Sequence, residues 1–202
     1  MGLSFRLELM RCRWVERFER WTGMHRVVSY PEGAKVNLGC GQQYLEGWVN
    51  VDSNPGVTTD LACDFRELPQ YFPPGSLAVI QMIHSISYLR YWEAQDFFRG
   101  VHTLLQPKGC LILEFPDIEK CARRIRFCHG ELGPYLEAVR AIYAFDLDQI
   151  RCRESYIPYH FGWSAWHINE ELRQAGFSRI RIRQPQTHGP RFWRDTRVEA
   201  IK

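Results

Sequence analysis

K-V-N-L-G-C-G-Q-Q-Y-L-E-G-W-V-N-V-D, residues 35–52, is the stretch that decides the fold. An apolar run at 36–38 ends in Gly39-Cys40-Gly41, and a second run at 48–51 ends in Asp52. Two strands that stop at one edge of a sheet would place these glycines beside the carboxylate. Glycine allows a close backbone approach and positive φ, and a carboxylate can accept from both hydroxyls of a ribose. The stretch therefore predicts a nucleoside-binding site.

The composition is that of an ordinary soluble globular protein. Hydrophobic residues make up 45% and charged residues 24% of the 202 residues, which suits one domain with its own core. The formal net charge of +3 is too small to indicate a nucleic-acid partner. No apolar segment approaches the roughly 20 residues of a membrane helix, and no signal-peptide pattern opens the chain. The seven cysteines form no C-x-x-C pair, so we expect a reduced, cytoplasmic protein without a metal site.

Residues 1–33 read as an N-terminal amphipathic helix and its lead-in. Apolar residues recur there at steps of three and four, and Gly23 ends the pattern; they are Leu7, Met10, Trp14, Phe18 and Trp21. Neighbouring arginines would suit a membrane surface, but interspersed glutamates offset them. Packing on the domain or on a partner is therefore favoured, and this helix could serve as the surface of a homodimer.

The remainder of the chain alternates between strand and helix patterns. This rhythm indicates right-handed parallel crossovers and an α/β sandwich. Strands are expected at 77–83, 110–115, 177–183 and 196–201, and helices at 92–105 and 169–176. Between them, residues 116–163 form a helical insertion placed to cover a ligand at the strand ends. Arginines on one face of 177–183 could bind an anion, although a solvated edge strand is the commoner explanation.

The spacing of the glycines disfavours a dinucleotide cofactor. A dinucleotide fold needs a third glycine where this chain has Tyr44, and an acid about 20 residues on, whereas Asp52 comes much sooner. The connection between the two strands is also too short for a crossover helix. A pyrophosphate would therefore lack the helix N-terminus that usually binds it.

Several motifs resemble those of one enzyme family. N-L-G-C-G at 37–41 and G-W-V-N-V-D at 47–52 are similar to the class I S-adenosylmethionine-dependent methyltransferases, in particular to a bacterial branch written G-C-G, short loop, G-W-x-N-V-D. Further matches follow in order: Asp64 with Leu68-Pro69, a strand running into His84, L-L-Q-P-K-G-C-L-I-L-E-F-P-D at 104–117, H-F-G-W-S at 160–164 and L-R-Q-A-G-F at 172–177. The resemblance covers residues 34–202.

This resemblance implies a fold and a cofactor site. The fold would be a Rossmann-like three-layer sandwich, with a mostly parallel seven-stranded sheet and an antiparallel last strand. Asp52 would hold the ribose of S-adenosyl-L-methionine, and Asp64 would accept from the adenine amino group, unless Asp64 is instead a helix cap or a turn acid. The residues implied in cofactor binding are Asn37, Gly39, Cys40, Gly41, Asp52, Ser53, Asp64, Phe65, Met82 and Ile83.

Three residues are candidates for the catalytic chemistry of an enzyme of this kind. His84 and His160 could serve as a base for an oxygen acceptor, and Asp117 could orient the acceptor. For each of the three a structural role explains the residue as well, as a satisfied histidine or as a helix cap. The chain departs from the family at Ala78 and at Ser87-Tyr88, which bears on the acceptor and on catalysis.

The acceptor itself is expected to be a small molecule or a glycan precursor, methylated at oxygen or nitrogen. No nucleic acid is expected, because the arginines are spread over separate elements. The alternative hypothesis is a non-catalytic cofactor-binding homologue that acts as a partner or regulatory subunit.

Overall fold

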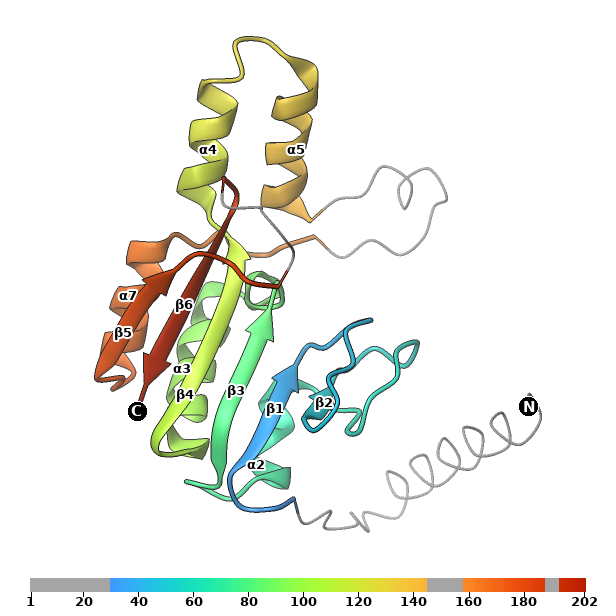
Figure 1. The fold of residues 1–202 in the computed structure, drawn as a ribbon, viewed down its shortest axis with the longest axis vertical. Coiled ribbons are helices and arrows are strands. Elements are labelled where there is room, and N and C mark those ends of the chain that lie inside the picture. Colours follow the sequence, from blue (N-terminus) through green and yellow to red (C-terminus); the bar gives the residue numbers. More distant parts are fainter. Residues whose placement is uncertain (1–29, 145–157, 188–192) are drawn as a thin grey trace, which may run out of the picture. The chain divides into compact units, whose positions relative to one another are not determined.

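The described residues after position 30 are built around a mixed sheet of six strands (Figure 1). The structure, a computed structural model, describes residues 30–144, 158–187 and 193–202, so the predicted N-terminal helix lies outside the described residues. The strand order is β2-β1-β3-β4-β6-β5. Five strands run in one direction and β6 runs against them. The strands are β1 Ala34–Leu38, β2 Val49–Val51, β3 Leu77–Ile83, β4 Leu105–Pro116, β5 Arg179–Arg183 and β6 Asp195–Ile201.

The Rossmann-like α/β prediction agrees with this arrangement, but the predicted number of seven strands is wrong for the described residues. A seventh strand would lie beyond β2. At that place Leu61 makes one isolated parallel bridge to Val51. The segment that follows turns directly into the 3-10 helix η1, Phe65–Glu67, and the short helix α2, Leu68–Tyr71, so it does not extend the pairing.

The two faces of the sheet differ in burial. On one face Ile80, Leu111 and Ala200 lie side by side and are fully buried beneath α3, Tyr91–Leu104, and α7, Ala165–Gln174. On the other face the alternate residues Val79 and Cys110 are only partly buried. Among the described helices none forms a layer over this second face, so the described residues contain two of the three predicted layers. The physical reason is the connection from β1 to β2, which is too short to carry a helix.

Two further helices follow β4. They are α4, Ile118–Arg126, and α5, Leu132–Tyr143, and they form a hairpin beyond the end of the sheet where the parallel strands finish (Figure 1). Cys121, Ala138 and Ala141 make a small core between them. This hairpin coincides with part of the predicted insertion, whose residues 145–157 lie outside the description. None of the described helices combines the length and the apolar character that crossing a bilayer requires.

Candidate functional site

The glycine turn after β1 packs tightly against the segment that follows β3. Gly39 and Gly41 have φ of 67° and 51°, in the left-handed region that favours glycine. The amides of Gly39 and Cys40 both donate to the carbonyl of Val51, at 2.8 and 3.1 Å. A Cβ atom on Gly39 would lie 2.4 Å from Oγ of Ser85, and that hydroxyl donates to the carbonyl of Gly39 at 3.1 Å. Only glycine fits between β1 and this serine.

Asp52 joins the end of β2 to the same turn. Its Oδ2 accepts from the amide of Gly41 at 2.9 Å, and its Oδ1 accepts from the amide of Asn54 at 2.8 Å. Asp52 is partly exposed and Ser53 is exposed. Each carboxylate oxygen has two lone pairs, so Asp52 can still accept from the hydroxyls of a ligand. The structure thus brings the predicted glycines and the predicted carboxylate together.

A buried amide network shapes the loop between β1 and β2. Oδ1 of the fully buried Asn50 accepts from Nδ2 of Asn37 at 3.0 Å and from the amide of Leu45 at 2.8 Å. Its Nδ2 donates to Oδ2 of Asp60 at 3.0 Å. The side chain of Asn37 therefore lies beneath the turn and supports the loop. Because these bonds span the whole loop, it is held in place without the helix of a dinucleotide fold.

Cys40 lies within the turn, and its thiol is not suited to act as a nucleophile. The residue is only 5% exposed. Burial, together with the negative charge of Asp52, raises the pKa of the Cys40 thiol to about 11. The thiol therefore stays protonated at neutral pH, and the site has to work by other groups.

Asp64 and Phe65 occupy the start of η1. Asp64 accepts from the amide of Arg66 at 2.9 Å and forms an ion pair with its guanidinium at 2.8 Å. The hydrogen bond from Arg66 lowers the pKa of Asp64 below its ordinary value. Phe65 lies edge-on to Phe97, with 5.7 Å between the ring centroids. Asp64 is thus a helix cap, which was the alternative explanation, and its role toward adenine stays a prediction.

The end of β3 presents a histidine with unusual backbone geometry. Met82 is buried beside Leu38 and Ile83 is partly exposed. His84 follows with φ of 57°; its amide donates to the carbonyl of Glu114 at 2.7 Å, and its carbonyl accepts from the hydroxyl of Tyr159 at 3.2 Å. These contacts fix the backbone of the first candidate base at the edge where the cofactor residues gather.

The segment that contains His160 lies against the same edge. The amides of His160 and Phe161 both donate to the carbonyl of Ser87, at 2.8 and 3.2 Å, in the 3-10 helix η2, Ile86–Tyr88. The rings of Tyr88 and Tyr159 meet edge-on with centroids 4.8 Å apart. The His160 side chain is exposed. The structure therefore brings the segments of the two candidate histidines together, although they are far apart in the sequence.

Asp117 is buried and its carboxylate is occupied by protein donors. It is 3% exposed, and its Oδ1 caps α4 by accepting from the amides of Glu119 and Lys120 at 3.0 and 3.4 Å. Its Oδ2 accepts from the amide of Ala165 at 3.2 Å and from the hydroxyl of Thr196 at 3.0 Å. These contacts match the helix-cap explanation, and orientation of an acceptor by Asp117 stays a prediction.

Sequence reasoning missed a buried acid beside His84. Asp195 is fully buried at the start of β6, and its Oδ2 lies 3.5 Å from Nε2 of His84. Arg194 forms an ion pair with the same carboxylate at 2.5 Å. Because β6 is antiparallel, it begins at the edge where the parallel strands end, and an acid directly before a last antiparallel strand is the signal that could have indicated Asp195.

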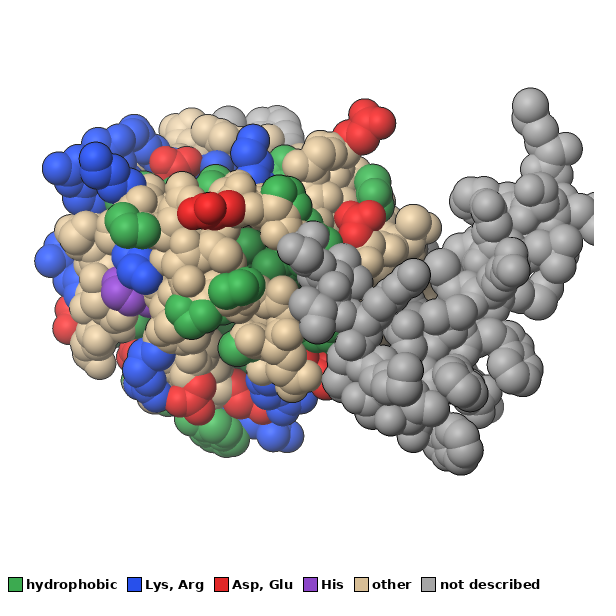
Figure 2. All heavy atoms as spheres, turned by 90° about the horizontal axis from the view of Figure 1, so that it is seen from below, with side chains coloured by type: hydrophobic (Ala, Val, Ile, Leu, Met, Phe, Trp, Pro, Cys, Tyr) green, Lys and Arg blue, Asp and Glu red, His purple; other side chains and the backbone are tan. Residues whose placement is uncertain are grey.

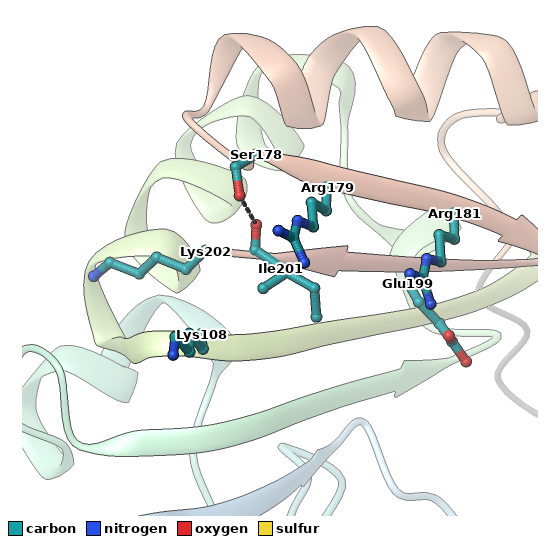
Figure 3. Close-up of a pocket in the computed structure, with 7 residues that line it drawn as sticks. All are labelled: Lys108, Ser178, Arg179, Arg181, Glu199, Ile201 and Lys202. Atoms are coloured by element: carbon teal, nitrogen blue, oxygen red, sulfur yellow. Dashed lines mark hydrogen bonds between the residues drawn. The ribbon is translucent and has the colours of Figure 1, made fainter.

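A separate basic hollow of about 440 Å³ is lined by residues of β4, β5 and β6 and their neighbours (Figure 3). Its lining residues are Lys108, Ser178, Arg179, Arg181, Glu199, Ile201 and Lys202. Seen from below, Lys and Arg side chains gather on the side of the molecule where β5 lies (Figure 2). None of the predicted site residues lines this hollow, and the arginines of β5 agree with a solvated edge strand.

Comparison with known proteins places the fold. No family model and no curated protein matches the sequence. A solved S-adenosylmethionine-dependent methyltransferase from Archaeoglobus fulgidus superposes with a TM-score of 0.56 at 12% identity, covering 100% of both chains. A possible histamine N-methyltransferase from Thermotoga maritima gives 0.51 at 15% identity, covering 94% of this chain and 97% of the other.

A third solved structure holds the demethylated cofactor. It is Haemonchus contortus phosphoethanolamine N-methyltransferase 2 in complex with phosphomonomethylethanolamine and S-adenosylhomocysteine, with a TM-score of 0.51 at 13% identity. This chain is covered completely but spans only 53% of the length of that protein. The fold is that of the S-adenosylmethionine-dependent methyltransferases. At these identities the likeness establishes the methyltransferase fold, and the activity has to be argued from the site.

Proposed function

We propose that this protein is an S-adenosylmethionine-dependent methyltransferase acting on oxygen or nitrogen of a small molecule or glycan precursor. The observation that carries the proposal is the junction of the glycine turn with Asp52 at the carboxyl edge of β1 and β2. The methyltransferase fold supports it. A ribose diol needs a carboxylate with free lone pairs, and Asp52 offers them while it holds the turn closed.

The residues present fit this cofactor. A Cβ atom on Gly41 would meet nothing within 4 Å, so the backbone of the turn is open to an approaching ligand. Gly39, Cys40 and Gly41 would lie against the methionine end, and Asp52 would hold the ribose. Met82 and Ile83 would border the methionyl part. When bound, S-adenosylmethionine supplies a methyl group on a sulfonium, whose carbon–sulfur bond breaks with its electron pair remaining on sulfur.

The contribution of the protein to such a displacement is mainly positioning. The lone pair of the acceptor must face the methyl carbon, and an oxygen acceptor must also lose a proton. His84 is the proposed base, because it lies at the same edge as the glycine turn and its ordinary pKa lies near neutrality. His160 stays a second candidate. Its side chain is exposed, and the preceding residue, Tyr159, donates a hydrogen bond from its hydroxyl to the carbonyl of His84.

Binding of the demethylated product tests the cofactor site. We expect S-adenosylhomocysteine to bind the wild type in isothermal titration, and Asp52→Ala to weaken binding by about 10- to 100-fold, because hydrogen bonds to a charged group contribute roughly 1.5–3 kcal/mol. Asp52→Asn, which keeps one acceptor oxygen, should lose less. The control is Asp96→Ala, since Asp96 lies on α3 with 74% of its side chain exposed. Equal affinity in all four proteins would contradict the assigned site.

Transfer of tritium from methyl-labelled cofactor to a cell extract separates the enzyme from its alternative. An enzyme labels an acceptor in the extract. A protein that binds S-adenosylhomocysteine through Asp52 and labels nothing would instead be the non-catalytic homologue.

A further inference from the structure

We propose that the outer edge of β5 binds an acidic segment of a partner protein, which adds to the sheet as a further strand. Acidic side chains would alternate along this strand and lie beside Arg179, Arg181 and Arg183, and the apolar side chains between them would cover Ile182. Three strands, β3, β4 and β6, separate β5 from β1 and its glycine turn. The proposal is therefore independent of the proposed function.

The first support is the position of β5 at the end of the sheet (Figure 1). β5 pairs with β6 on one side, and among the described strands none pairs with its other side. In such an edge strand, every second residue directs its backbone N–H and C=O away from the sheet, where they can bond a further strand. The five residues of β5 therefore offer an extended peptide a row of backbone donors and acceptors.

The second support is the charge on one face of β5. Arg179, Arg181 and Arg183 alternate along the strand, so they share a face, and all three are exposed. None of them forms an ion pair with another described residue. Glu199 lies opposite Arg181 in β6, but it is already paired with Arg197 at 2.8 Å. The arginines of β5 are thus available to carboxylates of a partner.

The third support is the hollow beside these arginines (Figure 3). Arg179 and Arg181 line it together with Lys108, Lys202 and Glu199, so four of its five charged lining residues are basic. Its volume of about 440 Å³ gives room for acidic side chains of an added strand.

The fourth support is an exposed isoleucine on the opposite face of β5. Ile180 and Ile182 lie beside Ala200 and Val198 of β6, on the face that α7 covers. Ile180 is partly buried, whereas Ile182 is 54% exposed. An apolar residue of a neighbouring strand can bury such a side chain. The partner should therefore have acids that alternate with apolar residues rather than a run of acids.

The same side chains disfavour two other occupants. If the sheet were extended by a second copy of this chain, with β5 antiparallel to β5 about a two-fold axis, arginines of both copies would share one face, and like charges opposite one another destabilise a sheet. A nucleic acid would satisfy the arginines, but it would leave Ile182 and the backbone edge unused. An acidic amphipathic strand satisfies all three features.

The test compares two fluorescein-labelled peptides of equal composition by fluorescence anisotropy with the full chain. In Thr-Glu-Val-Glu-Val-Glu-Thr the acids alternate with valines, and in Thr-Val-Glu-Glu-Glu-Val-Thr they are contiguous. We expect the alternating peptide to bind, and the contiguous one to bind at least about 5-fold more weakly, because it can place only one acid on the arginine face together with its valines. The alternating peptide should also slow hydrogen exchange of the amides at 179–183.

Substitutions in β5 test the individual contacts. Arg181→Glu should weaken binding of the alternating peptide by about 10-fold or more, and should bind better a peptide whose central Glu is replaced by Lys. Ile182→Thr keeps the β-branched shape and should weaken binding by about 2- to 5-fold. The matched control is Arg99→Glu, which makes the same change of net charge on α3, where 62% of the Arg99 side chain is exposed. It should leave binding unchanged.

Binding of the alternating peptide, slowed exchange in β5 and the reversed charge preference of Arg181→Glu together support the proposal. Equal binding of the two peptides, unchanged binding in Arg181→Glu, or unchanged exchange at 179–183 overturns it. Tighter binding of a single-stranded oligonucleotide than of the peptide also overturns it, as does a dimer in sedimentation velocity that Arg181→Glu abolishes. If circular dichroism shows that Arg181→Glu does not fold, Arg181→Ala decides, with an expected loss of about 2- to 5-fold.

Discussion

At the scale of single residues, two glycines of one turn have the same backbone geometry and different surroundings. Gly39 and Gly41 both have positive φ. A Cβ atom added to Gly39 would lie 2.4 Å from Oγ and 2.7 Å from Cβ of Ser85, whereas one added to Gly41 would meet nothing within 4 Å. Gly39 is therefore required by its positive φ and by the lack of space for a Cβ atom. Gly41 is required by its positive φ alone.

Alanine substitutions separate the two reasons. We expect Gly41→Ala to lower the free energy of unfolding by about 1–2 kcal/mol, which is the cost of a left-handed L-residue. Gly39→Ala adds a clash and should cost about 1–3 kcal/mol more, as overpacking does. Urea titration followed by circular dichroism measures both. The double variant Gly39→Ala with Ser85→Gly removes both clashing atoms and should recover stability to near that of Gly41→Ala. A Gly39→Ala variant no less stable than Gly41→Ala would contradict the close approach.

These residues also show what the sequence could predict of the site. The glycines and Asp52 were predictable, because each ends a strand and their contacts span only 11 residues. The contacts of Ser85 with Gly39 and of Asp195 with His84 were not predictable, even though Asp195 itself stands out as an acid before the last strand, because these contacts depend on the order and direction of strands that are remote in sequence. The local sequence pattern predicts which residues end a strand. Which strand ends lie next to one another depends on the strand order of the sheet.

At the scale of elements, a single carboxylate joins α4, α7 and β6. Asp117 caps α4 through the amide of Glu119, accepts from the amide of Ala165 at the start of α7, and accepts from the hydroxyl of Thr196 in β6. The same neighbourhood explains why α7 begins at Ala165 although the apolar pattern predicts 169. Ser164 and Asp117 supply the cap before the amphipathic pattern starts.

Asp117→Ala should therefore lower stability, by about 2–4 kcal/mol, because one helix cap contributes about 1 kcal/mol and buried donors left without an acceptor each cost about 1–3 kcal/mol. Asp117→Asn keeps one acceptor oxygen and should lose less. Thermal and urea unfolding should show stability falling from the wild type to Asp117→Asn and further to Asp117→Ala. Alanine stability equal to wild type, combined with loss of methyl transfer, would instead favour the predicted role in orienting an acceptor.

At the scale of the whole molecule, the strand–helix rhythm predicted the α/β architecture, and the short glycine connection accounts for its main departures. A loop without a helix leaves Val79 and Cys110 partly exposed, on a face that a sandwich of three layers would cover. Hydrophobic periodicity along one strand shows that the strand has a buried face, but it does not show which segment covers the other face. The number of strands and layers depends on how long the connections between the strands are and on whether they carry helices.

The last strand is held to the sheet by a buried charge pair that links stability to pH. Glu114 is fully buried in β4 opposite Arg197 of β6, with 2.9 Å between Oε1 and Nη1. Its carboxylate also accepts from the amides of Gln186 and Thr187, at 2.8 and 3.1 Å. Burial raises the pKa of Glu114, but the hydrogen bonds from Arg197 and from these amides outweigh it and leave the pKa below its ordinary value.

A lowered carboxyl pKa stabilises the fold above the unfolded-state value of about 4.3, and this contribution is lost as the pH falls through the folded-state pKa. We expect Glu114→Gln to lower the free energy of unfolding at pH 7 by about 1.5–3 kcal/mol, since it removes the charge from one hydrogen bond of Arg197, which keeps its ion pair with Glu199. The variant should also lose less stability than the wild type between pH 5 and pH 3. Asp96→Asn, which breaks an exposed pair, should change stability by less than about 1 kcal/mol. Urea unfolding at pH 7, 5, 4 and 3 measures both effects. If the free energy of unfolding falls equally with pH in Glu114→Gln and in the wild type, protonation of Glu114 does not contribute to acid unfolding.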